Sequence, residues 1–102
     1  MKVYPITYSV QYETCDTLVA VFGTAGDAIN YLKEHPEAMQ GDEMCIYEIQ
    51  MGEDYGYEDR IATVFYRWDD NEWFIEHRGG LQQTLGKVVY NHETGEDEWD
   101  RG

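Results

Sequence analysis

Lysine and arginine are scarce in this sequence. Seven of them stand against 21 aspartates and glutamates, so the formal net charge is −14 over 102 residues. So few cations cannot neutralise a phosphate backbone, which excludes nucleic-acid binding through a basic face. The same shortage disfavours adsorption to an anionic membrane. We therefore expect neither nucleic acid nor a membrane as a direct partner.

Long apolar runs are also missing, and the two cysteines are too few for a disulfide framework. No apolar run approaches the roughly 18 residues that a transmembrane helix needs, and residues 1–8 lack the apolar core of a signal peptide. Cys45 lies in an apolar stretch and is predicted to be a buried, inert thiol. Cys15 has acidic neighbours, which disfavour a reactive thiolate. These features predict a cytoplasmic protein.

The common catalytic and metal-binding motifs are absent. His35, His77 and His92 form no pair at helical spacing, there is no C-x-x-C, and the one serine, Ser9, stands outside any G-x-S-x-G. Gly23 and Gly26 precede no phosphate-binding signature. We therefore expect no enzyme, no metal and no cofactor.

Aromatic residues, by contrast, are plentiful. Tyrosine, tryptophan and phenylalanine make up 15% of the chain, and hydrophobic residues 42%. An acidic disordered chain carries far fewer such side chains, so the composition predicts a folded protein. A chain of this length is too short for two independent cores, which favours a single domain spanning residues 1–102.

The order of apolar patterns predicts an α+β fold. β-Branched and aromatic runs indicate strands at residues 2–10, 17–22, 44–51, 60–68 and 72–77, with 87–90 as a last core strand. Pro5 places an edge or a bulge in the first strand. Residues 81–86 fit either a helical turn or a loop, and residues 96–100 either a hairpin arm or a frayed tail. The expected architecture is an antiparallel sheet of about five or six strands in ββαβββ order, with one main helix packed on one face.

That helix is predicted at about residues 25–34. Thr24 is a favourable N-cap, Asp27 stands at the third helical position, and apolar residues follow at helical spacing. Pro36 disfavours helical geometry at His35, so the helix should end there.

The strand at residues 60–68 is apolar on both faces. Ala62, Val64 and Tyr66 share one face, and Ile61 and Phe65 share the other. A sheet covered by one helix should have one wet face. Either the C-terminal segment covers the second face, or that face is a contact surface; the aromatic side chains fit both a small core and an interface.

Acidic residues concentrate in three clusters, at residues 53–59, 69–72 and 93–100. Alternate connections of an antiparallel meander meet at one end of the sheet, so some of these clusters could merge into one acidic patch. A net charge of −14 exceeds what solubility alone requires. The predicted partner-binding residues are six acids of the first two clusters and the two tyrosines within the first: Glu53, Asp54, Tyr55, Tyr57, Glu58, Asp59, Asp69 and Asp70.

The first half of the chain resembles a group of small α+β domains of phages and bacteria. The pattern is an opening Val3-Tyr4 strand, a Val21-Phe22-Gly23-Thr24 turn into a helix, Ala28-x-x-Tyr31-Leu32 within the helix, and Tyr47-Glu48-Ile49 in the next strand, within residues 2–52. In style the acidic, aromatic second half is similar to phage anti-defence proteins of the anti-CRISPR kind and to immunity proteins. The resemblance implies a phage or mobile-element context, and hence the host cytoplasm, and it carries over no functional residue.

Charge and resemblance together predict an inhibitory binding protein. Its acidic and aromatic surface would mimic nucleic acid and block the basic surface of a host nucleic-acid-binding defence effector. Three alternatives stay open: a non-catalytic accessory domain that self-associates into a homodimer, an immunity-type inhibitor of a toxin, and a protein that sequesters a cationic small molecule.

Overall fold

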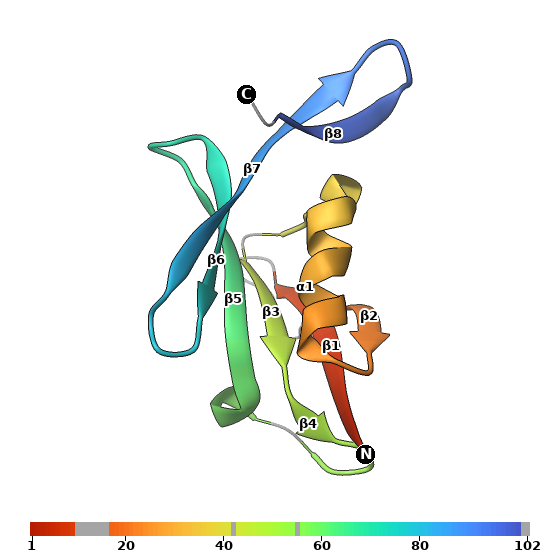
Figure 1. The fold of residues 1–102 in the computed structure, drawn as a ribbon, viewed down its shortest axis with the longest axis vertical. Coiled ribbons are helices and arrows are strands. Elements are labelled where there is room, and N and C mark those ends of the chain that lie inside the picture. Colours follow the sequence, from red (N-terminus) through yellow and green to blue (C-terminus); the bar gives the residue numbers. More distant parts are fainter. Residues whose placement is uncertain (10–16, 42, 55, 101–102) are drawn as a thin grey trace.

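The computed structural model describes residues 1–9, 17–41, 43–54 and 56–100. Their strands form a curled antiparallel sheet in the order β2-β1-β3-β5-β6-β7-β8, with β4 paired to β1 (Figure 1). The strands, in chain order, are β1 (Lys2–Ser9), β2 (Thr17–Phe22), β3 (Glu43–Tyr47), β4 (Ile49–Gln50), β5 (Arg60–Arg67), β6 (Glu72–His77), β7 (Gln82–Asn91) and β8 (Glu96–Asp100).

The helix α1 (Ala25–Glu34) has the predicted bounds. The Thr24 hydroxyl accepts a hydrogen bond from the backbone N–H of Asp27 at 3.1 Å, which satisfies one of the unpaired donors of the first turn. Two short 3-10 helices are also described. η1 (Pro36–Ala38) follows His35, and η2 (Tyr57–Asp59) precedes β5. No described helix is long and apolar enough to cross a membrane.

The predicted α+β class is wrong. The described chain is mostly β, with eight strands and a single ten-residue α-helix, where a ββαβββ order of five or six strands with a main helix was expected. The count rises from six to eight because the predicted strand at 44–51 is divided at Glu48 into β3 and β4, and because residues 96–100, predicted as a hairpin arm or a frayed tail, form β8. Residues 82–86 extend the predicted last strand into β7, and both they and residues 96–100 are mostly polar or acidic. Such residues form strands here without leaving the apolar alternation from which strands are read.

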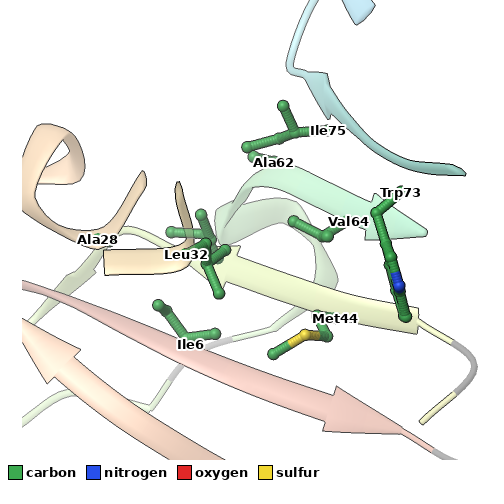
Figure 2. Packing of buried hydrophobic residues seen from close by; sticks show 9 residues of the cluster. Ile6, Ala28, Leu32, Met44, Ala62, Val64, Trp73 and Ile75 are labelled. Carbon is green, nitrogen blue, oxygen red and sulfur yellow. The ribbon is translucent and has the colours of Figure 1, made fainter. Parts of the chain in front are cut away.

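The core lies between the sheet and α1. Ala28 and Leu32 of the helix pack against side chains from β1, β3, β5 and β6, and Ile6, Leu32, Met44, Ile46, Val64 and Ile75 are fully buried (Figure 2). Removing this apolar surface from water supplies the main driving force for the fold.

Pro5 lies inside the sheet, so of the two predicted alternatives the edge is wrong. A bulge is found one residue further on, where the β1–β2 register shifts between Ile6 and Thr7. β1 pairs with β2 on one side and with β3 and β4 on the other. Pro5 pairs with Val21 of β2, whereas on the other side the pairing stops at Ile6 and resumes at Val3. The interruption between β3 and β4 lies opposite the proline, so the missing N–H leaves no gap in a continuous ladder.

As far as Asp100, where the described chain ends, the C-terminal segment does not cover the second face of the sheet. Val88 and Trp99 of the β7–β8 hairpin pack against the core cluster, on the same side as α1. On the opposite face Phe65 and Phe74 stack with ring centroids 6.1 Å apart, and the Arg67 guanidinium lies 4.1 Å from the centre of the Phe74 ring. These three side chains are half-buried.

Candidate functional site

Of the three predicted acidic clusters, the two that contain the predicted partner-binding residues lie at opposite ends of β5. Residues 53–59 precede this strand and Asp69 and Asp70 follow it. Eight strand residues separate them, a span of about 23 Å at the usual rise per residue. Tyr55 and the side chain of Tyr57 lie outside the described part of the chain. The predicted residues therefore do not form one patch.

Some residues of the first cluster form hydrogen bonds that stabilise their own loop. The Asp59 carboxylate accepts a hydrogen bond from the Gly56 N–H at 2.9 Å, and the Asp59 carbonyl accepts one from the Glu48 N–H at 2.9 Å. Arg78 donates to the Glu58 carbonyl. The side chains of Glu53, Asp54 and Glu58 are exposed, whereas Asp59 is half-buried. Asp59 thus has a structural role in this loop.

The second cluster is a tight turn with an exposed tryptophan. Asn71 adopts a positive φ of 60°, and Asp70 lies 3.4 Å from the Arg67 guanidinium. Trp68 is 84% exposed and packs edge-on against Tyr66 at a centroid distance of 4.8 Å. Asp69 and Asp70 are exposed, and a surface ion pair such as Arg67–Asp70 contributes little stability.

A large cleft lies elsewhere, between the end of α1 and the β7–β8 hairpin. Its volume is about 890 Å³. One wall runs from Lys33 through Glu37, and the other consists of Tyr90 and the segment from Gly95 to Trp99. We call it the acidic cleft, because five of its lining residues carry carboxylates: Glu34, Glu37, Glu96, Asp97 and Glu98.

A bulge in β7 precedes the hairpin that forms one wall of the acidic cleft. Gln82, Gln83, Thr84 and Gly86 pair with β6, and Leu85 is skipped in the register; from Lys87 onward the strand pairs with β8 instead. Gly86 has a φ of 122°, and a Cβ there would lie 3.4 Å from Cε3 of Trp99. The glycine lets the strand turn and lets the indole pack against it. The hairpin consequently bends toward η1.

Trp99 anchors this hairpin to the body of the protein. Its ring is half-buried and packs against the core cluster, while its indole Nε1 is buried without a hydrogen-bond partner. A buried donor without an acceptor costs free energy, so the contact holds by apolar packing alone.

The opposite wall is fixed by a contact between two rings and by a proline. The rings of Tyr31 and His35 pack with centroids 4.4 Å apart and planes tilted by 35°, and Pro36 is buried. His35 Nδ1 lies 2.8 Å from a Glu37 carboxylate oxygen. A backbone hydrogen bond, and secondarily the bond to His35, lowers the pKa of Glu37. This carboxylate is therefore ionised at neutral pH.

A second cleft of about 760 Å³ adjoins the first. The two share Lys33 and Glu34, and the second is further lined by residues of α1, β6, β7 and β8, among them Glu72, Lys87 and Asp100. The Thr84 hydroxyl donates to Glu72 at 2.9 Å across the β6–β7 pair. Acidic side chains thus line both sides of the junction between α1 and the hairpin.

The chemistry of the acidic cleft favours binding of a large cation. Among residues 1–9, 17–41, 43–54 and 56–100 no three His, Cys, Asp or Glu side chains are grouped as metal ligands, so the carboxylates are dispersed around the cleft. Tyr90, which is 56% exposed, and Trp99 add aromatic surface, which attracts lysine and arginine side chains.

Cys45 is a buried free thiol, as predicted. Burial, with a contribution from Glu43, raises the pKa of Cys45 to about 11. The thiol is protonated at neutral pH and is not a nucleophile. Cys15 lies outside the described residues.

Comparison of the chain with protein-family models, curated proteins and solved structures gave no match in any of the three. The resemblance of residues 2–52 to phage domains therefore stays a prediction. The sequence did mark residues 93–100 as an acidic cluster. The contribution of Glu34 and Glu37 could not be read from it, because only the fold brings them opposite β8.

Proposed function

We propose that this protein is a non-catalytic, cytoplasmic binding protein that inhibits a nucleic-acid-binding protein by occupying its basic surface. The observation that carries the proposal is the acidic cleft, in which five carboxylates from two distant segments surround Tyr90 and Trp99. The resemblance to phage domains favours an effector of host defence as the target.

The physical basis is electrostatic complementarity combined with aromatic anchoring. A net charge of −14 creates a field that accelerates encounter with a basic surface and repels competing nucleic acid. Once bound, lysine or arginine side chains would contact the cleft carboxylates and the Tyr90 ring. The exposed carboxylates of Glu53, Asp54 and Glu58, far from the cleft, act through this long-range field.

The experiment is competitive release from the immobilised protein. A lysate of a candidate host is passed over it at low salt, and bound proteins are released with duplex DNA or with a neutral polymer of similar mass. We expect DNA to release basic nucleic-acid-binding proteins, whose DNA binding the free protein then inhibits, while the neutral polymer releases none. Retention that resists both DNA and high salt, or captured proteins whose DNA binding is unaffected, contradicts the proposal.

A matched pair of variants locates the surface. Glu96→Lys with Glu98→Lys changes the net charge by the same amount as Glu53→Lys with Asp54→Lys. We expect the first pair to abolish capture and the second to weaken it slightly through the loss of long-range field. If both variants capture the partner to the same reduced extent, the loss is due to net charge alone and the assignment to the acidic cleft is wrong.

A second candidate, self-association, rests on β2, which is the edge strand among the strands that the structure describes. Its residues Thr17–Phe22 carry no charge, and Leu18 and Val21 are 59% and 50% exposed on the face that pairs with Thr7 and Pro5. Uncharged, apolar edges pair readily with other strands. Sedimentation at several protein concentrations tests it: a dimer that persists at high salt and is lost in Val21→Lys supports the candidate, and a monomer throughout contradicts it.

A further inference from the structure

The strand β8 forms an open edge of the sheet. It ends the strand order, with β7 on one side and no described strand on the other. An edge strand presents backbone N–H and C=O groups that can pair with an additional strand.

The acidic cleft runs along this edge. Its lining includes the five consecutive residues Gly95, Glu96, Asp97, Glu98 and Trp99. Side chains of a strand alternate between its two faces, so a cleft over one face would be lined by every second residue. Lining by successive residues places the cleft along the backbone edge as well as over one face. The facing wall is the segment from Lys33 to Glu37.

The sequence of β8 determines which charge an additional strand paired with it should carry. Glu96, Glu98 and Asp100 share one face, Asp97 and Trp99 share the other, and all four acids are exposed. Like charges on adjacent strands destabilise pairing, so a second copy of β8 is disfavoured. A strand with lysine or arginine side chains meets acids on both of its faces.

We propose that an extended, lysine- or arginine-rich segment of the partner protein binds by adding a strand to β8. Its main chain pairs with the β8 backbone within the acidic cleft. Its basic side chains meet the carboxylates of Glu96, Glu98 and Asp100 on one face, and the side chains that alternate with them lie beside Asp97 and Tyr90 on the other. This inference rests on the proposed function and specifies how the partner is held.

Backbone N-methylation of a basic peptide tests strand addition. The parent peptide is a short extended sequence alternating arginine and threonine, and two derivatives carry N-methyl groups at the odd or at the even residues. In a paired strand only every second N–H points toward the neighbour. We expect one derivative to lose about tenfold or more in affinity and the other to bind like the parent, because each lost backbone hydrogen bond and its steric clash weaken the pairing.

Two protein variants serve as controls in the same titration. Glu96→Lys with Glu98→Lys should abolish binding of the parent peptide, and Glu53→Lys with Asp54→Lys should retain it. Amide hydrogen exchange of β8 should slow on binding, since its free N–H groups become paired.

The outcomes separate the two proposals. If both methylated peptides bind like the parent, in a salt-dependent way that requires Glu96 and Glu98, strand addition is overturned and the proposed function stands. If no basic peptide binds, strand addition is overturned as well, and the competitive release experiment decides the proposed function independently.

Discussion

At the scale of single residues, Gly86 determines where the C-terminal hairpin points. Its φ of 122° belongs to a region that side chains other than glycine rarely adopt, and the Trp99 ring fills the space beside it. Gly86 therefore determines both where β7 turns and where the Trp99 indole, which anchors β8, packs.

The substitution Gly86→Ala tests this role. We expect a loss of about 1–3 kcal/mol in the free energy of unfolding, because a residue with a side chain is strained at this φ. Urea denaturation measures it. The matched control is Gly23→Ala, where a Cβ meets nothing within 4 Å, and its effect should stay within about 0.5 kcal/mol. Equal effects at the two glycines would show that Gly86 has no special conformational role.

Cys45 is predicted to resist thiol reagents until the pH is high. The pKa of Cys45 is raised to about 11 in the folded protein. The thiolate is therefore suppressed below the pKa of an unfolded cysteine and forms only as the pH rises through the folded-state pKa. In a Cys15→Ser background, mass spectrometry should find Cys45 unlabelled at pH 8 and increasingly labelled toward pH 11. Because the unfolded chain loses this proton at a lower pH than the folded protein does, stability should fall as the pH rises from the unfolded-state pKa to the folded-state pKa. Rapid native-state labelling at pH 8 contradicts this assignment.

At the scale of elements, the helix was predictable, whereas the first half of β7 was not, and β8 was one of two alternatives for residues 96–100. Thr24, Asp27 and Pro36 are local signals, which fix the ends of α1 whatever surrounds it. Residues 82–86 form a strand because β6 is there to pair with them, a tertiary cause that leaves no local pattern. The acidic cleft was out of reach for the same reason: residues 93–100 were visible as an acidic cluster, but their partners Glu34 and Glu37 lie some 60 residues away in the chain.

The attachment of the β7–β8 hairpin is predicted to depend on the apolar part of Trp99. Trp99→Ala should destabilise the protein by about 2–3 kcal/mol, below the range for fully buried tryptophans because this ring is half-buried. Trp99→Phe should cost less than about 1 kcal/mol, since it removes the buried indole N–H that has no partner. Chemical denaturation compares the two. If phenylalanine costs as much as alanine, the indole N–H contributes to stability and the packing account of the hairpin is wrong.

At the scale of the whole molecule, the net charge of −14 is distributed over separate regions. The 53–59 loop and the 69–70 turn lie at opposite ends of β5, and the acidic cleft lies between α1 and the hairpin. This distribution gives a long-range field on most sides, while the aromatic side chains of the cleft provide one place for close contact.

The same charge should make stability depend on salt. Raising the ionic strength from about 0.01 M to about 0.15 M shortens the screening length from about 30 Å to about 8 Å and weakens self-repulsion. We expect the urea midpoint to rise. Glu96→Lys with Glu98→Lys, which reduces the net charge from −14 to −10 since each substitution adds two, should show a smaller rise. A midpoint independent of salt would show that repulsion is not a significant term.

The central claim is that close contact with a basic partner occurs at the acidic cleft and not at the 53–59 loop. The most direct measurement is an NMR titration of the isotope-labelled protein with the alternating arginine–threonine peptide. The account predicts that amide shifts concentrate in Lys33–Glu37 and Gly95–Trp99 and that they reverse on adding salt. Shifts centred on residues 53–59, or spread evenly over all acidic segments, would contradict it.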